Sequence, residues 1–438
     1  MSGPDLSHAR VLRIAFPIVL SNATVPLLGL VNTGVIGQLG SAAPIGAVGL
    51  GAVVLTSVYW LFSFLRMGTT GIVAQAFGRG DAAEVSAGLW RALIVALAAG
   101  AVLIAAQAGI AAAAFRLAPA SPEVESLARA YLGIRIWGAP ATIGLFALNG
   151  WLIALERTRA ILALQLVTNG LNIVLDIGFV LGLGLGVEGV ATATLIAEWS
   201  GLGFGLWLAR GAFTARPALA VILNRDRLTR MVSVNRDIMI RSVLLQGCFT
   251  AFLFLGSGEG DVTLAANQVL LQFLEITAYV LDGFAFAAET LVGQAVGAGL
   301  PLRLRRAAGV CGTWALGGAV ALSLAFWLGG PMLIDALSTD PAVRAEARIY
   351  LPWLALSPLI GVGGWMFDGI FVGATLAREM RNTVIVSTLV YAAIVAALLP
   401  VWGNHALWAG LMAMNLMRGV VMAFLYQRAE ARAATAAA

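Results

Sequence analysis

The chain has 438 residues, of which 60% are hydrophobic and only 11% are charged, and its formal net charge is +5. Soluble domains carry about 45–50% apolar and about 25% charged residues, so this composition, with a mean hydropathy of +0.91, excludes a soluble globular protein. Apolar runs of about 20 residues, each long enough to cross a hydrocarbon core, recur along the whole chain. The sequence therefore predicts an all-α polytopic membrane protein without a separate soluble domain.

Twelve predicted transmembrane helices follow one another along the chain. They lie at about 11–39, 45–77, 86–115, 124–155, 160–183, 187–210, 232–257, 261–297, 306–330, 345–376, 380–401 and 405–427. The first run contains Pro17 and Pro26 and has no small-residue cleavage site, so we interpret it as a retained helix and not as a signal peptide.

Arginines occupy alternate connections between these spans, and lysine is absent from the chain. The arginines of these connections and of the tail are Arg79, Arg157, Arg159, Arg216, Arg225, Arg227, Arg230, Arg303, Arg305, Arg306, Arg378, Arg381, Arg428 and Arg432. The opposite connections are short and poor in arginine, such as GSAAP and GSGEGD, or acidic, such as SPEVE. Because basic loops stay in the cytoplasm, we expect both termini there and the chain in a cytoplasmic (inner) membrane, with no nucleic acid as a partner.

An internal repeat links the two halves of the chain. The segment QAFGRG at 75–80 matches QAVGAG at 294–299, a shift of 219 residues, and the same shift carries NG at 149–150 onto DG at 368–369. An even number of six spans in each half makes both halves point the same way, as in transporters built from parallel repeats.

This repeat predicts two pseudo-symmetric six-helix lobes. We expect an N-terminal lobe at 1–211, a cytoplasmic linker at 212–231 and a C-terminal lobe at 232–438. Substrate binding is expected in or between such lobes.

Four polar residues of the N-terminal half share one predicted depth. An α-helix rises ~1.5 Å per residue, which places Asp176 roughly 10 Å below the outer end of its span. Asn32 and Thr194 lie at a similar count from the outer ends of their own spans, and Asn172 is one turn deeper than Asp176. An ionised carboxylate at that depth is costly, and burial favours its neutral form. We therefore expect a proton-coupling group, with a structural hydrogen-bonding group as the alternative, because no arginine in these outer halves offers itself as a partner.

A second polar pattern runs along the eighth predicted span. Its members recur every seven residues and are Gln268, Glu275, Asp282 and Glu289. Seven residues drift only ~20° around a helix, so all four lie along one face, which must contact protein or water. With Asp368 and Gln246 they predict a substrate cavity, and a buried structural network is the alternative.

A charge pair is predicted at the cytoplasmic side. The repeat maps Arg66 onto Ala285, which lies one helical turn before Glu289. Arg66 and Glu289 therefore share a depth at which an unpaired charge is costly. We expect a salt bridge between them that gates the cytoplasmic side, or else two charges that snorkel separately.

Three segments carry a family resemblance. FLRMGTTGIVAQAFGRGD, LDGFAFAAETLVGQAVG and FDGIFVGATLAREMRN, which begin at residues 64, 281 and 367, resemble the multidrug and toxic compound extrusion family and its DinF-like branch. The resemblance implies cation-coupled export of amphipathic, often cationic compounds by alternating access. It also implies proton coupling at the pair Asn172 and Asp176, and functional acids at Asp282 and Asp368.

Two departures from the family pattern concern the coupling ion. Asn32 stands where the family usually has Asp, and an amide cannot bind and release a proton. Coupling therefore rests on Asp176 alone, or the chain is a variant, natural or engineered, with impaired coupling. Gln246 stands where Na⁺-using relatives tend to have Glu, which weakens an oxygen-ligand site for Na⁺. We expect H⁺ as the coupling ion in preference to Na⁺.

Other functions receive less support from the sequence. A flippase for a lipid-linked sugar would need several basic residues for a pyrophosphate headgroup, and only Arg66 and Arg241 are main candidates. A membrane-embedded lipid-modifying enzyme would need convergent His, Asp or Arg motifs, which are absent. We expect no catalytic residues, no cofactor and no metal centre, small amphipathic substrates, and a functional monomer.

Overall fold

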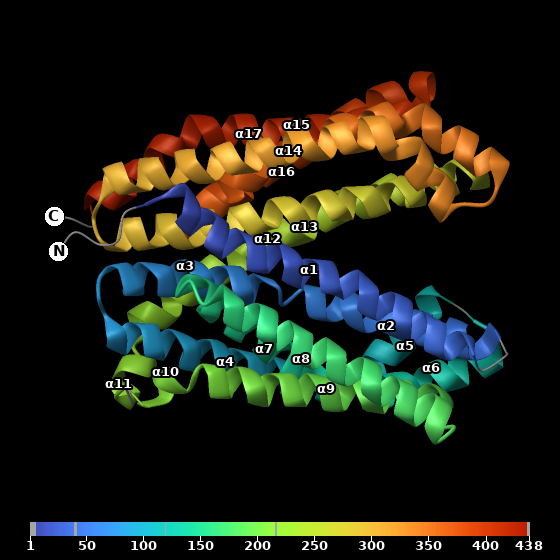
Figure 1. Cartoon of the computed structure of the whole chain (residues 1–438), viewed down its shortest axis with the longest axis horizontal. Coiled ribbons are helices and arrows are strands. Elements are labelled where there is room, and N and C mark those ends of the chain that lie inside the picture. Colours follow the sequence, from blue (N-terminus) through green and yellow to red (C-terminus); the bar gives the residue numbers. More distant parts are fainter. Residues whose placement is uncertain (1–5, 39–41, 119, 215–216, 436–438) are drawn as a thin grey trace. The chain divides into compact units, whose positions relative to one another are not determined.

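The computed structural model describes residues 6–38, 42–118, 120–214 and 217–435. Over these residues the chain is helical and contains no strand, which confirms the predicted all-α fold class (Figure 1). Arg216, one of the predicted cytoplasmic arginines, lies outside the described residues.

The described helices follow one another with short connections. In chain order they are α1 (His8–Gly37), α2 (Ala42–Trp60), α3 (Phe64–Gly78), α4 (Ala82–Ala105), α5 (Gln107–Leu117), α6 (Pro122–Arg135), the 3-10 helix η1 (Ile136–Gly138), α7 (Ala139–Ala154), α8 (Thr158–Asp176), the π-helix η2 (Ile177–Gly182), α9 (Gly186–Leu208), α10 (Arg210–Thr214), α11 (Leu219–Ile222), α12 (Arg225–Ser257), α13 (Asp261–Gly297), α14 (Pro301–Leu337), α15 (Pro341–Gly373), α16 (Ala377–Trp402) and α17 (Asn404–Thr435).

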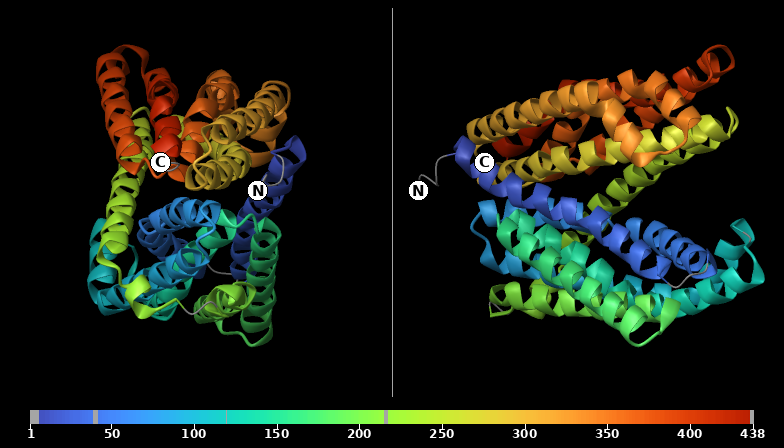
Figure 2. Two further views of the ribbon diagram at one scale, coloured as in Figure 1. Left: turned by 90° about the vertical axis from the view of Figure 1, so that its left-hand side faces the viewer. Right: turned by 45° about the vertical axis from the view of Figure 1, so that its right-hand side comes forward.

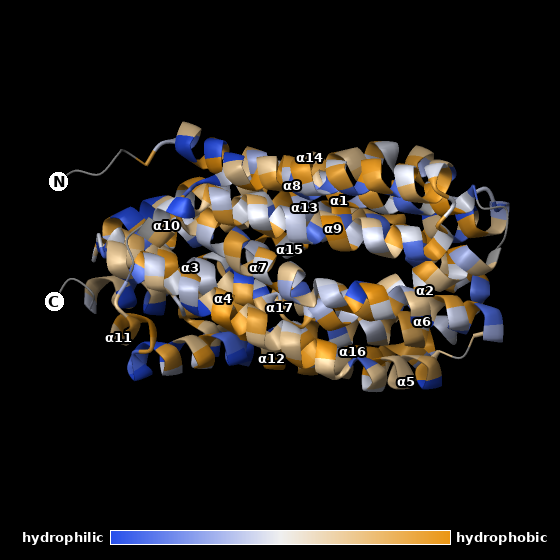
Figure 3. Ribbon diagram, turned by 90° about the horizontal axis from the view of Figure 1, so that it is seen from below, coloured by the Kyte–Doolittle hydropathy of each residue, from blue (hydrophilic) through white to orange (hydrophobic). Residues whose placement is uncertain are grey.

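Every predicted span corresponds to a long helix or to consecutive helices that continue one another. Spans two to five are interrupted, for example between α4 and α5, and between α6 and α7, where η1 intervenes. Ten helical segments of the described chain are long and apolar enough to cross a membrane. The remaining two predicted spans are α1 and α9, which are 30 and 23 residues long. Hydrophobic residues recur along the labelled helices, interspersed with neutral and hydrophilic ones (Figure 3).

The helices pack into two compact units. Unit 1 holds the described residues of Met1–Val19, Thr70–Gly80 and Arg230–Ala438, and unit 2 holds those of Leu20–Thr69 and Asp81–Thr229. In unit 1, α13 packs against α15, and α16 lies beside α17 (Figure 2). In unit 2, α4 packs against α7, and α8 against α9. Unit 1 thus includes two segments of the first half of the chain, and a division into lobes in chain order stays a prediction.

The backbone confirms the internal repeat at its predicted shift of 219 residues. Glu156 and Thr375 are non-glycine residues with positive φ, at 58° and 54°, a conformation that is uncommon for residues with a Cβ. Gly80 and Gly299 form a second such pair, with φ of 73° and 67°. Each pair is separated by the repeat distance, so the two halves turn alike at the ends of equivalent helices.

The repeated motif QAxGxG forms a reciprocal helix contact inside unit 1. A Cβ on Gly78 of α3 would overlap the carbonyl oxygen of Gln294 on α13, and a Cβ on Gly297 would overlap the carbonyl oxygen of Gln75. The shift of 219 exchanges the two partners, as an approximate two-fold axis requires. Glycine is needed at both positions because the two backbones touch there.

A second equivalent contact occurs once in each unit. In unit 2, Gly150 of α7 packs against the carbonyl of Arg66. In unit 1, Gly369 of α15 packs in the same way against the carbonyl of Ala285. The predicted equivalence of Arg66 and Ala285 is therefore confirmed in three dimensions.

Candidate functional site

Asp176 ends helix α8 inside unit 2, and its side chain is fully buried, with 0% exposure. With the Asn32 amide oriented to satisfy its hydrogen bonds, its nitrogen donates to Asp176 Oδ2 at 2.7 Å and to the carbonyl oxygen of Leu28 at 3.1 Å. Within the described residues, Asp176 Oδ1 has no hydrogen-bond partner. The π-helix η2 begins at the next residue, Ile177, and such distortions are frequent at functional sites.

The other two residues of the predicted group meet one helical turn away. Asn172 of α8 donates from Nδ2 to Thr194 Oγ1 on α9 at 3.1 Å. Thr194 in turn donates to the carbonyl oxygen of Val190 at 3.0 Å. The four residues predicted at one depth are thus joined in two direct contacts, on three helices of unit 2, with α8 and α9 side by side (Figure 1).

Sequence reasoning missed the continuation of this polar stripe along α8. Asn169 donates to Thr24 Oγ1 of α1 at 3.0 Å, and Gln165 donates to Asn169 Oδ1 at 3.2 Å. The spacing of Gln165, Asn169, Asn172 and Asp176 by four, three and four residues is helical and was available as a signal. The same test that found the stripe on the eighth span would have found this one.

A buried ion pair also escaped the sequence analysis. Arg135, the last residue of α6, contacts Glu198 of α9 with Nη1 to Oε2 at 2.6 Å, and both side chains are almost buried. Gly138 makes room for the pair, because a Cβ there would overlap Glu198 Oε2. Arg135 also interacts electrostatically with Asp176. Arg135 is thus an arginine near Asp176 that the sequence analysis did not identify, but its direct partner is Glu198 and not Asp176.

A cavity of about 160 Å³ within unit 2 is lined by several of these residues, but not by Asp176 or Arg135. Its polar lining comes from α7, α8 and α9 and consists of Asn149, Gln165, Thr168, Asn169, Asn172, Thr194 and Glu198. A polar cavity of this size can hold several water molecules, each of which needs only ~30 Å³.

Unit 1 contains a different arrangement around Asp368 of α15. Its Oδ2 accepts hydrogen bonds from Arg241 of α12 and from Arg418 of α17. The three residues are 7%, 7% and 5% exposed, so the cluster is buried. Arg418 also donates to Asn415 Oδ1 at 3.0 Å and interacts electrostatically with Asp282. Sequence reasoning listed Arg241 but missed Arg418, which lies in an apolar run.

The predicted stripe on the eighth span lies on one continuous helix, α13. Its exposure falls along the helix: Gln268 and Glu275 are exposed, Asp282 is half-buried, and Glu289 is 2% exposed. Gln246 on α12 is exposed as well. Their assignment to a substrate cavity stays a prediction.

The predicted gate residues belong to different units. Glu289 is buried within unit 1, whereas Arg66 is a half-buried residue of unit 2. A salt bridge between them stays a prediction.

Two arginine–glutamine contacts accompany the reciprocal helix contact of unit 1. Arg230 of α12 donates to Gln75 Oε1 at 2.8 Å, and Arg10 of α1 donates to the equivalent Gln294 Oε1 at 3.3 Å. Gln75 also donates from Nε2 to the carbonyl oxygen of Gly373 at 2.8 Å. Each of the two glutamines related by the 219-residue shift is thus bound by one arginine.

The described part of the chain contains neither a disulfide between its two cysteines nor a cluster of metal-ligating side chains. Cys248 and Cys311 are buried and free. Across the described ranges, no group of three His, Cys, Asp or Glu side chains could hold a metal ion.

The helical spans, the repeated halves and the polar groups buried in the spans together define a multi-pass membrane transporter built from two related halves. The MatE family profile matches residues 17–177 and again residues 238–398, which start 221 residues apart. These matches cover well over half of the chain, and the chain belongs to the MatE family.

Similar proteins agree with this assignment. The chain is 39% identical over 424 residues to DNA damage-inducible protein F of Escherichia coli, covering 95% of this chain and 91% of that protein. It is 27% identical to a probable multidrug resistance protein NorM of Xanthomonas campestris, covering 97% and 94%. A crystal structure of MATE in the bent conformation shares the fold with a TM-score of 0.88 at 20% identity, covering 98% of this chain and 97% of that one.

The family assignment settles the class of activity. The chain is a multi-pass membrane transporter of the multidrug and toxin efflux type, with small molecules as its partners, and not an enzyme. The predicted twelve-helix fold is the fold of its structural relatives.

Proposed function

We propose that this chain is a proton-coupled antiporter that exports amphipathic, often cationic compounds by alternating access. It works as a monomer in the bacterial inner membrane, with both termini in the cytoplasm. The names of its relatives, which include multidrug resistance proteins, support export of drugs or toxins. The asymmetry of the arginine-bearing connections supports the orientation.

The observation that carries proton coupling is the surroundings of Asp176. Its carboxylate is fully buried and its direct partner is a neutral amide, Asn32. The nearby Arg135 is bound to Glu198, which leaves the ionised form of Asp176 without a contacting cation of its own. Burial of this kind favours the protonated form, so a carboxyl group can take up a proton from one side and release it to the other.

Protonation of Asp176 changes the contact between α1 and α8. An ionised carboxylate only accepts hydrogen bonds, whereas a carboxylic acid also donates one. A proton on Oδ2 requires the Asn32 amide to present its oxygen in place of its nitrogen, whereas a proton on Oδ1, which has no hydrogen-bond partner among the described residues, leaves that contact in place and adds a donor beside it. Helix α1 contributes residues to both units, so it links the proton site to unit 1 through one continuous helix.

Alternating access is supported by the reciprocal contact between α3 and α13. Backbones that touch at Gly78 and Gly297 form a tight closure, reinforced by the arginines that bind Gln75 and Gln294. In the proposed orientation this contact lies at the cytoplasmic side, and it opens when the transporter faces inward. The equivalence of the two segments fits a rocking motion of one repeat against the other.

For the substrate we propose the exposed part of the α13 stripe. Gln268, Glu275 and Asp282, with Gln246 of α12, offer hydrogen bonds and negative charge to a cationic compound. Asp368 contributes little to that charge, because Arg241 and Arg418 compensate it. The same pairing weakens the case for a lipid-linked sugar flippase, since Arg241 is already occupied by a carboxylate.

The test is transport by purified protein in proteoliposomes under separately imposed H⁺ and Na⁺ gradients. We expect a fluorescent organic cation to move against its gradient when an outside-acid pH gradient is imposed, and a Na⁺ gradient alone to be ineffective. A protonophore should abolish the signal. Transport driven by Na⁺ at zero pH gradient would overturn proton coupling. Movement of the organic cation that is insensitive to both gradients would overturn antiport.

A further inference from the structure

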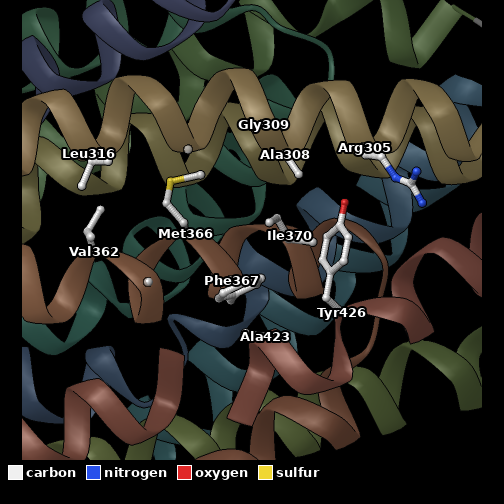
Figure 4. Close-up of a pocket in the computed structure, with 12 residues that line it drawn as sticks. Arg305, Ala308, Gly309, Leu316, Val362, Met366, Phe367, Ile370, Ala423 and Tyr426 are labelled. Atoms are coloured by element: carbon white, nitrogen blue, oxygen red, sulfur yellow. The ribbon is translucent and has the colours of Figure 1, made fainter. Parts of the chain in front are cut away.

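Unit 1 contains an apolar groove of about 520 Å³ between α14, α15 and α17 (Figure 4). Its side walls include Leu316 of α14 with Val362, Met366, Phe367 and Ile370 of α15. This volume lies in the range of ~300–1,000 Å³ that is typical of small-molecule sites. The groove is remote in sequence from Asp176 and shares no residue with the proposed coupling site or substrate stripe.

Glycines create the space on the α14 side. Gly309 and Gly312 line the groove, and a Cβ at either position would meet nothing within 4 Å. No side chain of the described chain therefore fills this part of the groove. The walls of an apolar void lose the dispersion contacts that they would otherwise make, and a water molecule in it finds no hydrogen-bond partners. A flexible hydrocarbon chain is the occupant that suits such walls within a membrane protein.

One end of the groove is charged. Figure 4 shows Arg305 and Tyr426 together at one end of the lining residues, with Leu316 and Val362 at the other. The Arg305 side chain is 66% exposed. It contacts Glu430 through Nε at 2.9 Å and through Nη2 at 2.7 Å, which leaves the hydrogens of Nη1 for a further acceptor.

Further arginines lie close to Arg305 and Tyr426 along the same two helices, and one of them, Arg428, contacts Glu379 at 3.3 Å. Arg303 and Arg306 share the first turns of α14 with Arg305, and Arg428 and Arg432 lie near the end of α17. In the proposed orientation these residues face the cytoplasmic leaflet, which carries anionic lipids. Basic pockets between transmembrane helices on that side recognise anionic headgroups, whereas neutral headgroups gain nothing from them.

We propose that this groove is a binding site for an anionic phospholipid of the cytoplasmic leaflet. One acyl chain lies along Gly309 and Gly312 between α14 and α15, and the phosphate lies at Arg305. The lipid fills a gap that the protein leaves open and joins α14 to α15 and α17. The site adds a lipid dependence to the proposed transporter and does not depend on which ion drives transport.

The experiment compares lipid retention by the purified full-length protein in native mass spectrometry. Protein in detergent is equilibrated with phosphatidylglycerol or with phosphatidylcholine of the same acyl chains. We expect wild-type protein to retain phosphatidylglycerol preferentially. Arg305→Gln should weaken phosphatidylglycerol binding about fivefold, the amount expected for one basic side chain near an anionic surface, and leave phosphatidylcholine unchanged.

Two glycine-to-leucine variants of α14 distinguish filling of the groove from the effect of a larger side chain elsewhere on the same helix. Gly312→Leu should displace both lipids, because the new side chain occupies the groove. Gly317→Leu is the matched control: Gly317 also lies on α14 with nothing within 4 Å of a Cβ, but it does not line the groove, and lipid retention should stay at the wild-type level. Glu430→Gln should keep the preference for phosphatidylglycerol, since it removes the competing carboxylate and retains Arg305.

Three results would overturn the proposal. They are equal retention of the two lipids by the wild type, unchanged preference in Arg305→Gln, and equal retention by Gly312→Leu and Gly317→Leu. Elution of each variant as a monodisperse peak on size exclusion ensures that a loss of lipid reflects the site and not unfolding.

Discussion

Asp176 in unit 2 and Asp368 in unit 1 are both buried aspartates on long helices, yet their surroundings are opposite. Asp176 accepts a hydrogen bond from an amide and has one oxygen without a partner in the described structure. Asp368 accepts from two guanidinium groups, those of Arg241 and Arg418. Asp176 thus has a neutral amide as its direct partner, whereas Asp368 is paired with two cations.

An acidic residue within a transmembrane helix is therefore not by itself evidence of a functional site. A carboxylate that accepts from two guanidinium groups on neighbouring helices joins those helices, and its removal leaves two buried cations without a partner. A carboxyl group among amides and hydroxyls changes its protonation at lower cost. We therefore expect the two aspartates to have different roles, with the proposed proton exchange at Asp176 and helix fixation at Asp368.

The largest effect is expected for Asp176→Asn. The amide is nearly the same size as the acid and can still bond to Asn32, so folding should be preserved, but it cannot carry a proton. Proton-driven transport in proteoliposomes should fall to the level of protein-free vesicles, while binding of the dye to the detergent-solubilised protein stays within about twofold of the wild type, less than 0.6 kcal/mol. Asp176→Glu, which keeps the carboxyl group, is the control and should retain part of the transport. Wild-type rates in Asp176→Asn at equal expression would remove Asp176 from the coupling mechanism.

Asp368→Asn should instead reduce stability. It leaves two buried guanidinium groups without their carboxylate, a change that typically costs about 3–5 kcal/mol. The measurement is denaturant unfolding in detergent, with Asp282→Asn as the control at a half-buried position. In the transport assay, Asp282→Asn should weaken cationic substrates more than neutral ones, whereas Asp368→Asn should weaken both alike. A selective loss of cationic substrates in Asp368→Asn would show that its charge reaches the substrate after all.

A charge swap tests the predicted gate, a salt bridge between Arg66 and Glu289. Either Arg66→Glu or Glu289→Arg alone should impair transport, because each places like charges together. The double swap should restore part of the activity, with a coupling of about 0.5–3 kcal/mol between the two positions in a double-mutant cycle. Losses that simply add would show that the two side chains act separately.

A smaller effect is expected at the reciprocal helix contact. Gly297→Ala places a methyl group against the carbonyl of Gln75 on α3, and overpacking of this kind costs about 1–3 kcal/mol. Because only the closed contact is strained, the variant should spend more time with that side open, which accessibility of an engineered cysteine nearby would report. Gly317→Ala, with open space around its Cβ, is the control. Equal cysteine labelling of the two variants would contradict a closure at this contact.

The sequence predicted the features that repeat or that depend on composition. Length and hydropathy located the spans, and the motif QAxGxG located both the repeat and the contact that it forms. Counting residues from helix ends brought Asn32, Asp176, Asn172 and Thr194 to one level, because helical rise is fixed. That arithmetic could not reveal which cations pair with which acids, since rotation of a helix about its axis decides the partner.

Single arginines in apolar runs were the main omission. Arg135 and Arg418 are each separated in sequence from the acids they contact, by 63 and 50 residues. Periodicity within one helix contains no information about such contacts between helices. The stripe from Gln165 to Asp176 was different, because its spacing was visible in the sequence.

The smallest effect is expected for Asn32→Asp, which places a second carboxyl group 2.7 Å from Asp176, the distance now spanned by the amide. Two carboxyl groups this close cannot both ionise, so they share one proton and the pair binds it more tightly than Asp176 alone. If the present asparagine weakens coupling, proton-driven transport should rise, by less than the tenfold that ~1.4 kcal/mol represents, and its optimum should move to higher external pH. Asn32→Ala is the control, since it removes the hydrogen bond without adding a titratable group and should not raise transport. An unchanged rate and pH profile in Asn32→Asp would mean that Asp176 carries the coupling proton without help from α1.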